Sequence, residues 1–324
     1  MIMRSNRLTL ISLLCAFSAL GIFVQSYVRS VKMVGFDLDY YANASAEGAV
    51  NNYKIFINWI LSYFEVPWIL VGLTPTILFF LVVDLCLNRF FAQGAKRYLY
   101  RSLFYFAPFL YLSTSGYRDL IISSLLAACY LSFKGRKYIL FLIFCALAYA
   151  LRDISIIIIF TVICLDKVGK KYIFLVLTPF LCIVSFFILL FISPWTVDLV
   201  QQLRQSYSGA ILNSNSNFLS GKFFYLAFPF DLAASSAIYF VGVVLLLPVM
   251  STLNFLLFTS TAVLFYKYWH LINFKTLIVF ISAYFVFIFG YCVVGYAPSA
   301  IMRHFCMLAC AFWIISFCNR NVME

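Results

Sequence analysis

Long apolar runs separated by short polar stretches recur along the chain. They predict ten helical membrane crossings, at residues 8–28, 66–87, 102–117, 119–133, 138–151, 154–166, 172–193, 237–265, 276–294 and 301–318. Hydrophobic residues make up 65% of the 324 residues and charged residues 10%, which is typical of a polytopic helical membrane protein. The sequence therefore predicts an all-α transmembrane bundle that forms a single integral membrane domain over residues 1–324.

Two of the predicted connections, residues 29–65 and 194–236, are long, and long connections are usually functional or mobile. The first crossing follows Arg4 and Arg7, is too long for a signal peptide and has no clear small-residue cleavage site, so we expect it to be retained.

The basic residues determine the predicted orientation. The net charge of +12 does not indicate nucleic-acid binding, because the basic residues form short clusters between apolar runs, such as Lys134/Arg136/Lys137. With both termini in the cytoplasm, 15 of the 23 Lys and Arg residues fall on the cytoplasmic side, as the positive-inside rule requires. We therefore expect a multi-pass protein of a bacterial inner membrane.

The ten cysteines all lie inside apolar runs, which indicates small core residues. None has metal-ligand spacing in a polar setting, and no pair outside the runs indicates a disulfide.

Two Arg-Asp dipeptides, Arg118-Asp119 and Arg152-Asp153, interrupt the apolar runs on the predicted outer side. Charged side chains at membrane depth are costly and usually face a protein interior or a watery cavity where they bind something. The guanidinium group suits bidentate phosphate binding, and Arg303 is predicted at a third outer end. The three arginines are therefore predicted to bind a phosphate or pyrophosphate, and Asp119 and Asp153 belong to the same predicted substrate-binding site. The alternatives are structural salt bridges, or interfacial anchors that reach the headgroups.

The central crossings are short, since 138–151 and 154–165 supply only 14 and 12 residues. A crossing needs about 20 residues. Either polar residues extend these helices, or Arg152-Asp153 lies in a recess below the outer surface.

Candidate groups for sugar chemistry lie elsewhere on the outer side. Asp37 and Asp39 can orient or deprotonate a hydroxyl, while Tyr40 and Tyr41 can stack on a sugar ring. A calcium-binding or merely solvated loop is the alternative. His304 can act as a base near neutral pH, or can have a structural hydrogen-bonding role.

The order of these features resembles the Wzy-type polysaccharide polymerases, especially the EpsG-like branch. The matching elements are Gly116-Tyr117-Arg118-Asp119-Leu120, the basic turn Lys134-Gly135-Arg136-Lys137, Leu151-Arg152-Asp153 and Met302-Arg303-His304. The same layout resembles GT-C glycosyltransferases, in which an aspartate of the first outer loop is the catalytic base.

The resemblance implies a glycosyltransferase that polymerises polyprenyl-pyrophosphate-linked oligosaccharide repeat units at the periplasmic face, for O-antigen, capsule or exopolysaccharide. Asp37, Asp39 and His304 would be the catalytic candidates, and no metal or other cofactor is expected. The implied partners are the lipid-linked oligosaccharide, the bilayer, a chain-length regulator and a flippase. The alternatives are a GT-C glycosyltransferase that uses a polyprenyl-phosphate sugar to decorate a glycan, and a flippase or transporter for lipid-linked saccharides.

Overall fold

The computed structural model describes residues 68–92, 94–114, 118–152, 154–168, 252–294 and 298–318, together with isolated positions between 181 and 195. Within these ranges every element is a helix, apart from one isolated antiparallel bridge between Phe91 and Cys318, so the predicted all-α class is confirmed for this part of the chain. The predicted crossing 8–28, most of 172–193, the first part of 237–265 and both long connections lie outside the described residues.

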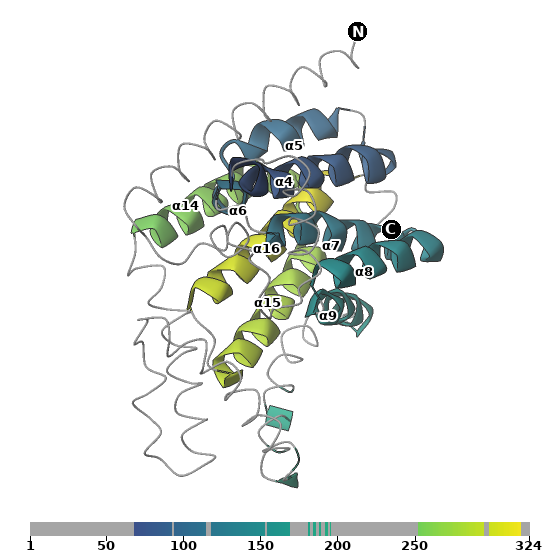
Figure 1. The fold of residues 1–324 in the computed structure, drawn as a ribbon, viewed down its shortest axis with the longest axis vertical. Helices are drawn as coiled ribbons and strands as arrows, with labels where there is room; N and C mark the ends of the chain where they lie inside the picture. Colours follow the sequence, from purple (N-terminus) through teal and green to yellow (C-terminus); the bar gives the residue numbers. More distant parts are fainter. Residues whose placement is uncertain are drawn as a thin grey trace. The chain divides into compact units, whose positions relative to one another are not determined.

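The helices follow the predicted apolar runs closely. They are α4 (Trp68–Leu81) with its π-helical continuation η1 (Val82–Cys86), η2 (Asn88–Phe90), α5 (Ala95–Leu103), α6 (Ala107–Thr114), α7 (Asp119–Lys134), α8 (Tyr138–Leu151), α9 (Ile154–Val168), α14 (Thr252–Lys267), η4 (Trp269–Leu271), α15 (Phe274–Val294) and α16 (Pro298–Phe317) (Figure 1).

The predicted crossing 102–117 differs from the structure, because this stretch holds the end of α5 and the whole of α6. The helical conformation is interrupted from Phe104 to Phe106, just before Pro108. Proline lacks the backbone N–H that a continuous helix would bond to the carbonyl four residues earlier, so the chain starts a new helix with Pro108 in its first turn.

The described helices fall into two compact units. The first unit holds α4 to α8, the start of α9 to Phe160, the end of α14 from Ser260, η4, and α16 from Cys306. The second unit holds the rest of α9, the start of α14, α15 and the start of α16.

Helix α7 is the central helix of the first unit, since every residue from Asp119 to Ser132 is buried. It packs against α8, α4 and α6. Ser123 and Ser124 donate hydrogen bonds to the carbonyls of the residues three positions earlier, at 2.6 and 2.8 Å. These bonds satisfy the hydroxyls inside the apolar surroundings of α7.

Helix α16 joins the first unit through Trp313. Its indole Nε1 donates a hydrogen bond of 2.7 Å to the Ser102 hydroxyl, and its ring stacks on Phe106 and Phe265, with ring centroids 4.9 and 5.4 Å apart. One buried side chain thus ties α16 to the segment between α5 and α6 and to α14.

Helix α8 buries only one face. Phe141, Phe144, Cys145 and Ala148 are buried at helical spacing, while large apolar side chains on the other face are exposed, Ile139 by 77% and Leu142 by 64%. No helix in the described part of the chain combines the length and the apolar character that a membrane crossing requires. The ten crossings therefore remain a prediction.

The turn between α7 and α8 contains an arginine in a left-handed backbone conformation. Arg136 has φ of 54°, and the Lys137 and Arg136 N–H groups donate to the carbonyls of Ser132 and Phe133, at 2.8 and 3.1 Å. This is the Schellman pattern that ends many helices, in which glycine is usual at the left-handed position. Here Gly135 lies one residue earlier, and an arginine takes the strained place.

We therefore expect Arg136→Gly to stabilise the protein by up to about 1 kcal/mol, because strain of about 1–2 kcal/mol is relieved and partly offset by the backbone entropy that glycine loses. Unfolding of the full chain in an uncharged detergent measures the change. Arg136→Ala, which removes the guanidinium and keeps Cβ, is the matched control and should bring no gain. Equal stabilisation by both variants would contradict the strain argument.

Candidate functional site

The α7–α8 hairpin brings Arg118, Asp119 and Arg152 together, because α7 begins where α8 ends. The two Arg-Asp dipeptides interact across the hairpin: Arg152 Nη1 lies 2.7 Å from Asp119 Oδ1, and Arg118 Nη1 donates to the Leu151 carbonyl at 3.0 Å. Both contacts join residues 33 positions apart.

The Arg152–Asp119 ion pair is largely buried. The Asp119 side chain is fully buried and the Arg152 side chain is 12% exposed. A buried carboxylate without a partner costs several kcal/mol, so the arginine compensates it with a charge-assisted hydrogen bond. Asp119 also lies in the first turn of α7, where the helix dipole favours a negative charge.

Arg118 contacts the C-terminal end of a helix, whereas Asp119 lies at an N-terminal end. Its hydrogen bond to the Leu151 carbonyl satisfies one of the acceptors that the last turn of α8 leaves free, at the negative end of that helix dipole. Its Nε, in contrast, is buried and has no hydrogen-bond partner. A buried donor of this kind normally binds something, so Arg118 retains capacity for an anion.

Ser155, in the first turn of α9, was not among the candidates from the sequence. Its hydroxyl is buried without a partner, and its backbone N–H donates to the Arg152 carbonyl at 3.0 Å. The available signal was a lone hydroxyl in the run Ile154–Phe160.

Arg118, Asp119, Arg152 and Ser155 form what we call the hairpin-end site. Its described charges are two guanidinium groups and one carboxylate, so one positive charge is left uncompensated by them. Two buried donors, Arg118 Nε and Ser155 Oγ, are unsatisfied. The chemistry that this set favours is binding of a phosphate-like anion by charge-assisted hydrogen bonds.

The other predicted site residues divide into two groups. Asp37, Asp39, Tyr40, Tyr41 and Asp153 lie outside the described residues. Arg303, which is partly exposed, and His304, which is buried, belong to the second unit, so their joining the hairpin-end site remains a prediction. Among the described residues no group of three or more His, Cys, Asp and Glu side chains could hold a metal ion.

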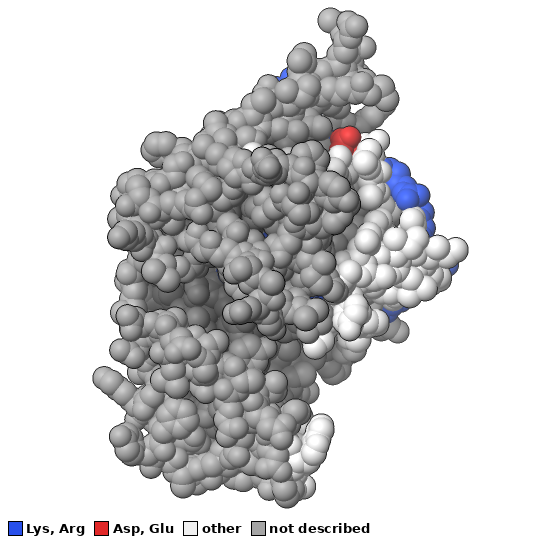
Figure 2. Space-filling model, in the orientation of Figure 1, with Lys and Arg blue, Asp and Glu red and all other residues white. Residues whose placement is uncertain are grey.

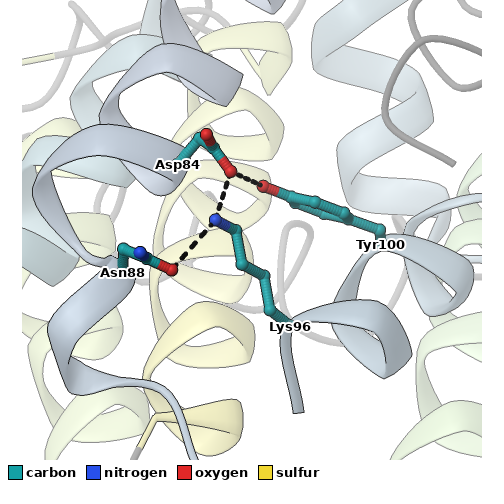
Figure 3. Close-up of polar contacts among 4 residues, drawn as sticks. All are labelled: Asp84, Asn88, Lys96 and Tyr100. Carbon is teal, nitrogen blue, oxygen red and sulfur yellow. Dashed lines mark hydrogen bonds and ion pairs between the residues drawn. The ribbon is translucent and has the colours of Figure 1, made fainter. Parts of the chain in front are cut away.

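A second polar cluster lies between η1 and α5 (Figure 3). Asp84 accepts a hydrogen bond of 3.2 Å from the Tyr100 hydroxyl and forms an ion pair with Lys96, whose Nζ also donates to Asn88 Oδ1 at 3.2 Å. Burial, and then the Asp84 charge, raise the pKa of Tyr100 well above its usual value, so the phenol keeps its proton and donates it. This cluster fixes α5 against the end of α4.

No family model, curated protein or solved structure matches the chain.

We expect Arg152→Gln to destabilise the protein by about 3–5 kcal/mol, because the buried Asp119 carboxylate would lose the guanidinium that pairs with it. The double variant Asp119→Asn/Arg152→Gln should recover most of that loss, since no buried charge then remains. Thermal or denaturant unfolding in an uncharged detergent measures both.

Arg118→Gln is the control for that prediction, because it should cost only the hydrogen bond to the Leu151 carbonyl, about 1 kcal/mol. An equal loss of stability in Arg118→Gln and Arg152→Gln would show that the ion pair stabilises the protein no more than an ordinary hydrogen bond does.

Proposed function

We propose that the protein is an integral membrane glycosyltransferase that polymerises polyprenyl-pyrophosphate-linked oligosaccharide repeat units at the outer face of the inner membrane. The observation that carries the proposal is the hairpin-end site, where the Arg118 Nε and the Ser155 hydroxyl are both buried donors without a partner. Such donors suit an anionic phosphate group.

Placement in a membrane has support from the outward face of α8. Ile139, Leu142, Ile143 and Leu147 are 48–77% exposed, and α9 adds Ile157 at 59%. Contiguous exposed apolar side chains of this size are unusual on a water-soluble protein and suit contact with lipid chains.

The dimensions of the hairpin suggest how a charged site can exist at membrane depth. The 16 residues of α7 span about 24 Å, whereas the hydrocarbon core is about 30 Å thick. If the basic turn at residues 134–137 lies at the cytoplasmic headgroups, the hairpin-end site lies short of the outer headgroups. The proposed active site is therefore a recess whose floor carries Arg118.

In the proposed reaction, an acceptor hydroxyl attacks the anomeric carbon of the donor sugar. The bond from that carbon to the phosphate oxygen breaks, and the lipid pyrophosphate leaves with the bonding electrons. Asp37 or Asp39, with His304 in reserve, takes the proton of the acceptor hydroxyl. Arg118, joined by Arg152 and Arg303, stabilises the charge that develops on the leaving group.

Arg152 and Asp119 contribute differently from Arg118 in this proposal. Because Asp119 holds Arg152 in a buried ion pair, Asp119 is a positioning residue. Arg118 contacts only a backbone carbonyl among the described residues, so it is the guanidinium best able to bind the phosphate directly.

We expect Arg118→Ala and Arg152→Ala to shorten the polymer more than Asp37→Asn, Asp39→Asn or His304→Ala taken singly. Because the departing pyrophosphate is a good leaving group, the reaction depends little on a base that deprotonates the acceptor hydroxyl. The negative charge that develops on the pyrophosphate must, however, be stabilised. Loss of one such donor typically lowers the rate about 100-fold. Polymer length on a gel, at matched membrane expression, is the measurement.

Arg118→Gln and Ser155→Ala separate a functional effect from a structural one. Ser132→Ala is the matched control for the serine, because its hydroxyl is also buried without a partner but lies at the other end of α7. Ser155→Ala should shorten the chains and Ser132→Ala should not. Long chains in Arg118→Gln, together with their loss in His304→Ala alone, would replace the phosphate-binding account with a histidine-base mechanism.

The glycan profile of a deletion strain distinguishes the alternatives. Single-repeat products indicate a lost polymerase, full-length chains without a branch indicate a decorating transferase, and absence of surface repeats indicates a lost flippase.

A further inference from the structure

Basic side chains gather at the end of the first unit where α7 turns into α8. We call this set the basic surface; its members are Arg89, Arg97, Arg101, Lys134, Arg136 and Lys137. Figure 2 shows a patch of Lys and Arg at the right of the view, with an acidic side chain above it. The surface lies at the opposite end of α7 from the hairpin-end site, about 24 Å away along the 16-residue helix.

The fold brings together basic residues that are far apart in the sequence. Arg89 and Lys137 both lie over the ring of the buried Phe90, 5.7 and 5.0 Å from its centroid. Both distances are within the range of a cation–π contact. The turn between α7 and α8 therefore lies beside η2, and its charges add to those of α5.

Helix α5 presents its charges outward because its other face is anchored. Lys96 and Tyr100 bind Asp84, while Leu99 and Leu103 are buried (Figure 3). Arg97, Tyr98 and Arg101 lie on the remaining face and are exposed. An amphipathic helix with cations and tyrosine on its open face is typical of a membrane interface.

The described acidic residues of the first unit do not balance the charge of the surface. Of the described acids in the first unit, Asp84 is paired with Lys96 and Asp119 with Arg152. No ion pair joins Arg97, Arg101 or Arg136 to a described acid. Arg136 also occupies the left-handed position that glycine would fill with less strain. An outlier of this kind is a reason to look for a function of the side chain.

Apolar side chains border the charges. Leu85 precedes Arg89 by one turn and is 72% exposed, and Ile139 follows Lys137 and is 77% exposed; Tyr98 and Tyr138 are exposed by 55% and 58%. A partner that meets this surface must offer negative charge next to hydrocarbon. Phospholipids have that combination, and tyrosine is enriched at headgroup level.

We propose that the basic surface is a binding site for the phosphate headgroups of anionic phospholipids, with Arg97, Arg101 and Arg136 as its principal contacts. The proposal requires a membrane-embedded chain, but it does not require that the chain be a glycosyltransferase. Binding to this surface and polymer length are separate measurements, so either proposal can fail alone.

The test uses the full chain purified in an uncharged detergent and titrated with short-chain phosphatidylglycerol, with phosphatidylcholine of the same chain length, and with inorganic phosphate. We expect saturable binding of phosphatidylglycerol, far weaker binding of phosphatidylcholine, and no competition by inorganic phosphate. Each basic residue near an anionic headgroup contributes about 1 kcal/mol, so Arg97→Gln/Arg101→Gln should weaken binding about 25-fold.

Two further variants distinguish a site from a general charge effect or a folding defect. Lys167→Gln/Lys267→Gln removes two exposed charges outside the surface and should change affinity less than twofold. Arg136→Gly should bind about fivefold more weakly although it unfolds at a higher temperature without lipid. Equal affinity for both lipids, displacement by inorganic phosphate, or equal losses in the two double variants would each overturn the proposal.

Discussion

The buried carboxylate of Asp119 is the constraint on which the first unit depends. A charge with no exposed surface must be compensated locally, and Arg152, 33 residues later, does so at 2.7 Å. That requirement fixes the register of α8 against α7, because a shift by one helical turn would separate the two groups. With the register fixed, Arg118 reaches the last turn of α8, and Ser155 follows at the start of α9. A structural ion pair thereby places the groups that are free to bind a ligand.

The apolar pattern was sufficient to predict most of the described helices, because α7, α8 and α9 begin and end where charged residues or glycine interrupt the hydrophobic runs. It did not predict the break before Pro108, since Phe104–Phe106 is as apolar as a helix interior, and the boundary depends on the missing N–H of proline.

For the candidate site, the sequence singled out Arg118 and Arg152 as candidates. It did not indicate that Arg152 pairs with the aspartate of the other dipeptide, across the hairpin. Neighbouring charges in a dipeptide suggest local pairs, whereas helix geometry directs adjacent side chains apart and brings opposite hairpin ends together. Ser155 was missed because a single serine in an aliphatic run normally bonds to its own helix, as Ser123 and Ser124 do. Its hydroxyl has no partner, which the sequence could not indicate.

The burial of α7 on every side bears on the order in which the protein is assembled. Three helices that pack against it, α4, α6 and α8, lie between Trp68 and Leu151, so they emerge from the ribosome before α9 is complete. Contacts of such short sequence separation form rapidly. The hairpin-end site spans only residues 118–155, so its parts can come together while the second half of the chain has still to be synthesised.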